Sequence, residues 1–173
     1  VISYLHRVPG HFPVASAFAV YDMFGCKKVL DVSAGWGDRL VAAIACPSIE
    51  EYYGIDSNPK LLDKYKALAK FFHGDTKVRL FHGKSESRND KLYKIKYFDL
   101  AFTSPPYFDC EIYEGEGAHT LNSFAEWVVK YLRPTVKNVY NSLKPGGWAL
   151  WNVSNIGSSN FQICEAVLHE STR

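Results

Sequence analysis

Apolar and polar positions alternate along this chain with two different periods. Five short apolar runs are typical of buried strands, at 28–32, 52–55, 78–82, 98–102 and 148–153. Segments with helical spacing separate them, at 14–24, 39–45, 58–72, 123–143 and 161–169. Strands that alternate with helices are typical of an α/β fold, because parallel strands need a crossover between them. The pattern therefore predicts one α/β domain built on a parallel sheet.

Glycine, proline and asparagine mark where these elements begin and end. Gly25 is placed to end the first helix, and Asn58 is expected to cap a helix that starts at Pro59. Pro134 is expected to kink or divide the long helical segment, because proline removes a helical hydrogen bond. The Lys-Pro-Gly-Gly run at 144–147 predicts a sharp stop and turn before the fifth strand.

Composition narrows the class of protein. The chain has 173 residues, 47% of them hydrophobic, which suits a single globular domain. No apolar run approaches the ~20 residues of a membrane helix, and no signal peptide is visible. The 4 cysteines form no Cys-x-x-Cys pair, so we expect a reducing, cytoplasmic compartment. A net charge of +2 is mild for a nucleic-acid binder, so any such contact needs a local patch.

A glycine-containing loop follows the first predicted strand. It reads Asp-Val-Ser-Ala-Gly-Trp-Gly over residues 31–37, and Asp56 ends the next strand about 20 residues after Gly35. An acid at that spacing is typical of ribose binding. A dinucleotide-binding loop would carry a third glycine where Leu40 stands. Asp31 would repel a pyrophosphate but attract a positive amino group, so the loop favours S-adenosylmethionine (SAM) over NAD.

The fourth strand runs into Thr103-Ser104-Pro105-Pro106-Tyr107. Two prolines cannot continue a sheet, because each lacks an N–H donor, so a rigid loop is expected to begin at Ser104. This loop offers a hydroxyl, a carbonyl before proline and an aromatic ring, which together suit a planar amine. The alternative reading is a plain proline-braced turn.

The same run resembles motif IV of the DNA amino-methyltransferases, which methylate cytosine N4 or adenine N6. Further segments resemble other parts of that family: motif I at 31–37, motif II at 55–59, an adenine-contacting segment at 83–86, the turn before strand five at 143–147, and motif X at 11–13. The order X, I, IV resembles the gamma arrangement, and the resemblance covers most of the chain. One departure is Val32-Ser33, where the family often has proline and phenylalanine.

The resemblance implies a Rossmann-like class I methyltransferase fold, three-layered, with strand order 3-2-1-4-5. That fold usually adds a terminal β-hairpin, and too few residues follow Val153 for a complete one. The implied cofactor is SAM, and the implied cofactor-binding residues are Asp31, Ser33, Gly35, Gly37, Asp56, Ser57, Ser85, Phe12 and Pro13. The implied catalytic residues are Ser104, Pro105, Pro106 and Tyr107.

The expected reaction is methylation of an exocyclic amine of an unstacked DNA base, with N4-cytosine placed ahead of N6-adenine. RNA guanine or a protein glutamine amide stays open as a substrate, as does a non-catalytic SAM-binding fragment. We expect residues 1–173 to form one catalytic domain without a separate target-recognition domain. The chain begins at Val1, so a trimmed piece of a longer protein is also expected.

Several other residues are given structural interpretations. No two histidines have the i, i+4 spacing of a helical metal site, so no metal is expected. Asp38 and Arg39 are interpreted as a helix-start charge and a surface or loop-bracing arginine. Cys110 is interpreted as an incidental thiol, and segment 108–120 as either a lid over the site or a plain loop.

Overall fold

The sheet has the strand order expected from the sequence. The computed structural model describes residues 10–87, 92–108, 121–155 and 162–173. Within them, one five-stranded sheet has the order β3-β2-β1-β4-β5, and every pair is parallel. The strands are β1 (Lys28–Asp31), β2 (Glu51–Asp56), β3 (Lys77–His82), β4 (Phe98–Thr103) and β5 (Leu143–Trp151). The predicted open α/β sheet is therefore confirmed.

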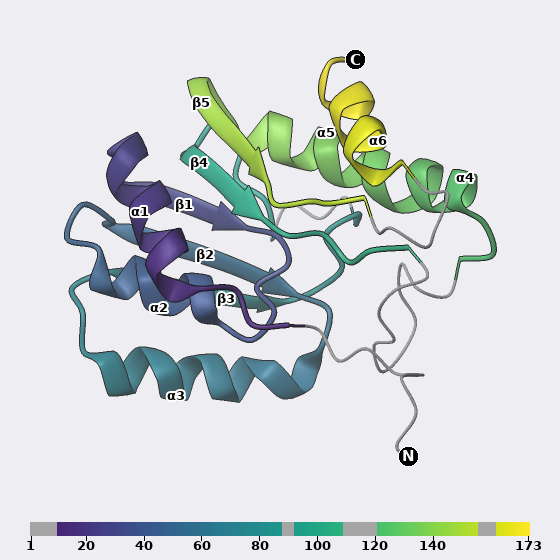
Figure 1. Ribbon diagram of the computed structural model, residues 1–173. Coiled ribbons are helices and arrows are strands. Elements are labelled where there is room, and N and C mark those ends of the chain that lie inside the picture. Colours follow the sequence, from purple (N-terminus) through teal and green to yellow (C-terminus); the bar gives the residue numbers. More distant parts are fainter. Residues whose placement is uncertain (1–9, 88–91, 109–120, 156–161) are drawn as a thin grey trace.

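Helices cover both faces of the sheet and make three layers (Figure 1). One face carries α1 (Val14–Phe24), α2 (Asp38–Ala45) and α3 (Leu62–Phe72), the last preceded by a 3-10 turn at Pro59–Leu61. The other face carries α4 (Phe124–Trp127), a π-helical turn η3 (Val128–Leu132), α5 (Arg133–Ser142) and α6 (Ile163–Ser171). As predicted, Gly25 ends α1 in the left-handed conformation, and the Asn58 side chain accepts from Lys60 N.

Buried strands supply the core because side chains alternate between the two faces. On β1, Val29 packs into the cluster beneath α1 and α2, whereas Leu30 packs into the cluster on the opposite face. Both side chains are fully buried. This two-sided burial explains why the strand appeared in the sequence as a continuous apolar run. Because β1 pairs parallel with β2 and β4, the carboxyl ends of these three strands lie at the same edge of the sheet. Asp56 is the last residue of β2 at this edge, and the loops that carry Gly35 and Ser104 begin there.

Pro134 divides the long helical segment, as predicted. Pro134 lies in the first turn of α5, and the π-helical turn η3 lies directly before it. Because proline has no N–H, the Lys130 carbonyl four residues earlier loses its helical donor, and the backbone widens there. The Thr135 hydroxyl donates to the neighbouring Tyr131 carbonyl at 2.8 Å.

The fifth strand differs from the prediction. It begins at Leu143, not at Trp148, and the Lys-Pro-Gly-Gly run lies inside it as a bulge. Between Phe98 and Leu100 the register of β4 against β5 shifts, so Leu143 and Trp148 face nearly adjacent residues. Gly146 takes a φ of +80°, which a side chain would strain. The predicted turn residues therefore bend a continuing edge strand instead of preceding it.

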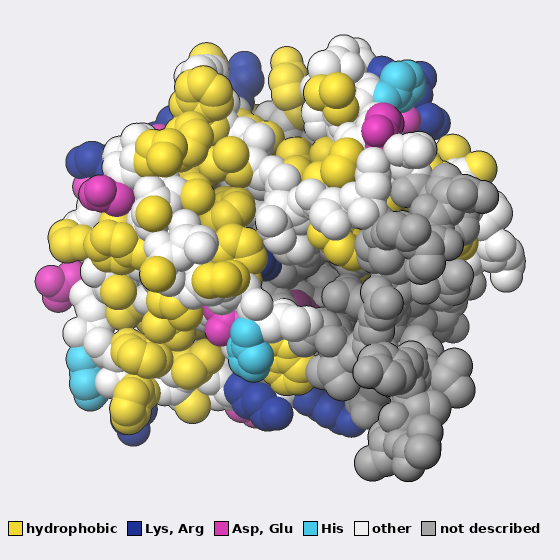
Figure 2. All heavy atoms as spheres, in the orientation of Figure 1, with side chains coloured by type: hydrophobic (Ala, Val, Ile, Leu, Met, Phe, Trp, Pro, Cys, Tyr) yellow, Lys and Arg dark blue, Asp and Glu magenta, His cyan; other side chains and the backbone are white. Residues whose placement is uncertain are grey.

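Hydrophobic side chains gather on the surface over α1 and the neighbouring edge of the sheet (Figure 2). Met23 and Trp148 are both more than half exposed, and the Trp148 ring meets Phe24 edge-on. Within the described parts of the chain, no helix is both long and apolar enough to span a bilayer. After β5, the described residues add α6 and no sixth strand.

Candidate cofactor and target site

Two glycines shape the loop after β1. Gly35 and Gly37 have φ values of +59° and +89°, which side chains rarely adopt. A Cβ on Gly37 would also lie 2.9 Å from Leu68 Cδ1 and 3.3 Å from the Tyr65 ring. The loop therefore needs glycine at position 37 both for its backbone conformation and for the close approach of α3. Both glycines belong to the loop at 31–37 that the sequence predicted to approach a ligand.

Asp56 links the ends of β1 and β2. Its Oδ2 accepts from Gly35 N at 2.8 Å, and its Oδ1 accepts from Asn58 N at 2.9 Å. Burial raises the pKa of Asp56, while these two backbone N–H groups act to lower it. Each oxygen keeps a second lone pair, so the carboxylate still has acceptor capacity for hydroxyl groups. Its neighbour Ser57 is exposed, and the Ser57 carbonyl faces His82 Nε2 at 3.1 Å.

Asp31 lies entirely inside the protein. Arg39 binds it through two nitrogens, with Nε 2.7 Å from Oδ2 and a terminal nitrogen 3.1 Å from Oδ1. Tyr52 donates its hydroxyl to Oδ2 at 2.8 Å, and Thr103 donates to Oδ1 at 3.3 Å. The Asp31 side chain has no exposed surface. In this arrangement Asp31 is the saturated partner of Arg39, and its contact with a cofactor stays a prediction.

Arg39 corrects part of the sequence interpretation. It is buried, not on the surface, and its pKa is raised: burial opposes the charged form, but Asp31 more than offsets that effect. A terminal nitrogen also donates to the Ser33 carbonyl at 2.5 Å. Arg39 therefore braces the loop, which was the other half of the interpretation. The sequence signal is its place in the first turn of α2, where side chains lean back toward the preceding loop.

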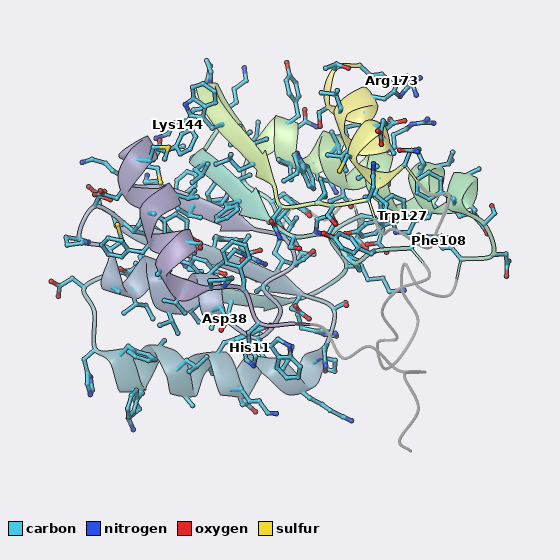
Figure 3. The ribbon with its side chains drawn as sticks, viewed as in Figure 1. His11, Asp38, Phe108, Trp127, Lys144 and Arg173 are labelled. Carbon is cyan, nitrogen blue, oxygen red and sulfur yellow. The ribbon has the colours of Figure 1, made fainter. Side chains whose placement is uncertain are left out.

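The segment before α1 lies across the start of α2 (Figure 3). Phe12 N donates to Asp38 Oδ2 at 3.0 Å, and His11 Nδ1 lies 3.1 Å from the same carboxylate. The His11 ring stacks on Trp36, with 5.7 Å between ring centroids. The Phe12 ring meets Phe102 edge-on, whereas Pro13 is exposed at the start of α1. The predicted residues Phe12 and Pro13 thus lie beside the β1 loop, held by Asp38.

Ser85 is buried in the loop after β3. Its carbonyl accepts from the Tyr93 hydroxyl at 2.5 Å and from Asn138 Nδ2 at 3.0 Å. Because Asn138 belongs to α5, these contacts join the β3 loop to the helix that follows motif IV. The next residue, Glu86, has a pKa raised by burial and lies near the Tyr93 and Tyr131 phenols. The sequence did not single out Glu86.

The loop of Ser104 to Tyr107 begins where β4 ends. The Ser104 hydroxyl donates to the Asn152 carbonyl at 3.2 Å, and Asn152 Nδ2 lies 3.4 Å from the same oxygen. Asn152 is itself fixed, because its N–H donates to the Thr103 carbonyl at 2.8 Å. The Ser104 hydrogen is therefore engaged, and a lone pair of its oxygen is left to accept. Asn152 gave no signal in the sequence, because its partner lies 48 residues away.

An aromatic cluster supports the second half of the loop. Pro105 is buried, Pro106 and Tyr107 are half-buried, and the Tyr107 ring packs against a cluster containing Phe108 and Trp127. Figure 3 labels Phe108 and Trp127, which lie together beneath α6. Segment 108–120 is interpreted from the sequence as either a lid or a plain loop. Only Phe108 of this segment belongs to the described residues, and Cys110 lies outside them.

The predicted residues meet at the carboxyl edge of the sheet. Ser33, Gly35 and Asp56 lie on adjoining loops of β1 and β2, and Ser104 follows the neighbouring strand β4. In the described ranges, no three His, Cys, Asp or Glu side chains converge as metal ligands. Sequence reasoning missed the partners of these groups. Tyr52 donates to Asp31, Tyr65 donates to the Gly35 carbonyl, and the Asn152 carbonyl accepts from Ser104.

No protein-family model matches the chain, and no curated protein matches it. Solved structures do. The tRNA (m1A58) methyltransferase of Aquifex aeolicus has a TM-score of 0.64 and 12% identity, over 95% of this chain and 55% of that one. Precorrin 8w decarboxylase of Methanobacterium thermoautotrophicum has a TM-score of 0.61 and 16% identity, over 94% and 74%. An S-adenosylmethionine-dependent methyltransferase of Clostridium acetobutylicum has a TM-score of 0.54 and 17% identity, over 80% and 48%.

Likenesses at such low identity establish a fold and not an activity. The chain spans about half of two of these structures and three quarters of the third. All three have TM-scores above 0.5 against this chain. The chain therefore has the Rossmann-like fold of class I SAM-dependent methyltransferases.

Proposed function

We propose that this chain is a SAM-dependent N-methyltransferase domain that acts on an exocyclic amine of a nucleobase. The observation that carries the proposal is the Ser104 hydroxyl, whose hydrogen is engaged by Asn152 at the end of β4. An amine nucleophile needs acceptors for its hydrogens, and this oxygen is arranged to accept. The proposed domain comprises residues 1–173.

The residues present fit the cofactor. Ligands of open α/β sheets bind across the carboxyl ends of the strands, at the point where strand order reverses. Here that point lies between β1 and β4, beside the loop of Gly35 and Gly37. Asp56 would accept from the two ribose hydroxyls, and Ser33 and Ser85 would line the nucleoside. Phe12 and Pro13 would close over the methionine end.

The chemistry needs positioning and no covalent nucleophile. SAM supplies an electrophilic methyl group: the amine nitrogen bonds to its carbon as the C–S bond breaks, and one amine proton leaves to solvent. Ser104 Oγ and the Pro105 carbonyl would accept the two amine hydrogens and stabilise positive charge that grows on nitrogen. Holding the nitrogen in line with the methyl carbon supplies much of the rate.

The base would be read after it leaves the stack. A base inside an intact duplex cannot bring its amine into line with a cofactor at the end of a strand, so the target must be extruded or single-stranded. Tyr107 would stack on it, supported from behind by the cluster around Phe108 and Trp127. Serine before Pro-Pro-Tyr places N4-cytosine ahead of N6-adenine, and DNA ahead of RNA.

The test is methyl transfer from labelled SAM to DNA, RNA and protein, followed by mass spectrometry of digests. We expect N4-methylcytosine or N6-methyladenine from DNA, at a rate that persists or rises with a mismatch opposite the target. Ser104→Ala, purified in parallel, controls for contaminating activity. Methylated guanine in RNA, or methylated glutamine in protein, would replace the DNA proposal. SAM binding without transfer to any of them would indicate a non-catalytic fragment.

A further inference from the structure

One buried hydroxyl in the described part of the chain has no partner. Tyr131 is 3% exposed, and its phenol oxygen makes no hydrogen bond. Buried hydroxyls are nearly always satisfied, because leaving one unpaired destabilises the folded state. An orphan donor of this kind needs a reason outside the protein's own hydrogen bonds.

The neighbours of that oxygen belong to the cofactor loops. Burial raises the pKa of the Tyr131 phenol, and the side chains of Ser85 and Ser33 act to lower it. Both serine hydroxyls lie close to the phenol, but neither is placed to form a hydrogen bond with it. Ser33 follows β1 and Ser85 follows β3, so the phenol lies between the two loops expected to hold the nucleoside. By contrast, the neighbouring Tyr93 hydroxyl is satisfied by the Ser85 carbonyl. Tyr93 is half-buried and its hydroxyl is used, whereas Tyr131 is buried and its hydroxyl is not used.

The backbone beneath Tyr131 is itself unusual. Tyr131 lies in the π-helical turn η3, directly before Pro134. Such turns cost helical hydrogen bonds and are frequent at functional sites. The widened turn ends in helix α5, which is tied to the Ser85 carbonyl through Asn138. The helical segment that carries Tyr131 is therefore held against the β3 loop by the hydrogen bond between Asn138 and Ser85.

We infer that the Tyr131 hydroxyl is a cofactor-binding donor that hydrogen-bonds a ring nitrogen of the adenine. This inference rests on the proposed SAM binding and adds a residue that the motifs do not contain. Adenine suits the place, because its ring nitrogens are acceptors and a phenol can donate to one. The free protein would carry the unsatisfied hydroxyl until the ligand arrives.

The experiment compares Tyr131→Phe with the wild-type chain, without and with S-adenosylhomocysteine. Removing an unsatisfied hydroxyl should leave the melting temperature of the free protein unchanged or higher. Affinity by calorimetry should fall by about tenfold, because the ring nitrogen loses its donor. Tyr140→Phe, at an exposed position of α5, is the matched control and should alter neither quantity.

Deaza analogues of the ligand identify the acceptor. With one of the 1-, 3- or 7-deaza forms, wild-type affinity should fall and Tyr131→Phe should cause no further loss. Equal affinity of Tyr131→Phe and wild type for the parent ligand would overturn the inference, as would a lowered melting temperature with unchanged affinity. A constant loss across all three analogues would also overturn it. If the wild-type chain binds no ligand at all, the proposed function fails first.

Discussion

Asp31 and Tyr131 both lie close to Ser33, but the Asp31 carboxylate has several hydrogen-bond partners and the Tyr131 hydroxyl has none. Every acceptor position around the Asp31 carboxylate is occupied by a protein donor, including both Arg39 nitrogens. The Tyr131 hydroxyl has none. Both side chains are buried, so exposure does not explain the difference.

The contrast distinguishes the residues that stabilise the site, around Asp31, from a group that we propose binds a ligand, the Tyr131 hydroxyl. A saturated buried network rigidifies its surroundings, and here it fixes the loop that bears Gly35 and Gly37. An unsatisfied donor stabilises nothing in the free protein, and it becomes useful once an acceptor enters. A change at Arg39 should therefore lower the stability of the fold. A change at Asp56 should weaken cofactor binding, and a change at Ser104 or Tyr107 should slow turnover.

The largest effect is expected from Arg39→Met. Removing the guanidinium leaves the Asp31 charge buried and unpaired, which should lower the free energy of unfolding by about 3–5 kcal/mol. Urea denaturation measures this loss. Lys66→Met, which breaks an exposed pair with Asp63, is the control and should cost no more than about 1 kcal/mol. The double variant Arg39→Met with Asp31→Asn should recover part of the loss, and an additive result would refute the charge explanation.

Asp56→Ala should act on binding. Loss of a charged acceptor for the ribose hydroxyls should cost about 1.5–3 kcal/mol of SAM affinity, measured by calorimetry. The fold should survive, which circular dichroism checks. Asp63→Ala, on the exposed first turn of α3, removes a carboxylate without a predicted ligand role and should leave affinity unchanged. Unchanged affinity in folded Asp56→Ala would reject the ribose assignment.

Ser104→Ala and Tyr107→Ala should act on turnover. Each should reduce kcat by about tenfold or more, because a hydrogen bond to growing charge is worth about 1.5 kcal/mol or above. SAM affinity should stay within a few-fold of wild type, since both residues face the target. Single-turnover assays and calorimetry on the same preparations separate the two quantities. Abolished SAM binding in either variant would show that the loop has been assigned to the wrong side.

The smallest effect is expected from Asn152→Ala, which should reduce kcat by about threefold through Ser104. Its side chain contributes only the longer contact to that hydroxyl, and the backbone carbonyl remains. The check is a double-variant cycle: in the Ser104→Ala background the Asn152 substitution should have no further effect. An equal loss in both backgrounds would mean that Asn152 acts elsewhere.

The sequence predicted the strands better than it predicted the partners of the site. β1 to β4 matched to within one residue at each end, because buried parallel strands show as continuous apolar runs. The bulge in β5 was missed because Pro and Gly predict a turn and a bulge alike. Gly35, Asp56 and Ser104 could be predicted as site residues because they lie at or just after strand ends. The pattern of apolar residues locates those ends.

The pairing of buried polar groups was beyond prediction. The sequence left Arg39 as either a surface or a loop-bracing arginine, because one arginine at a helix start carries no sign of its distant partners, Tyr52 among them. Tyr131 lies in the segment 123–143, whose spacing predicts a helix, but spacing does not tell whether a hydroxyl is satisfied. Both properties depend on contacts between elements far apart in the chain.

The pairing of β1 with β4 also bears on the order of folding. β1 can pair early with β2, but Val29 and Leu30 pair with Leu100 and Ala101 from the far half of the sequence. Closing so long a loop costs entropy and slows folding. Thr103 reaches Asp31 only once β4 has docked. The cofactor loop should therefore reach its final form late, and hydrogen-exchange protection at Ser33 should appear with that of β4.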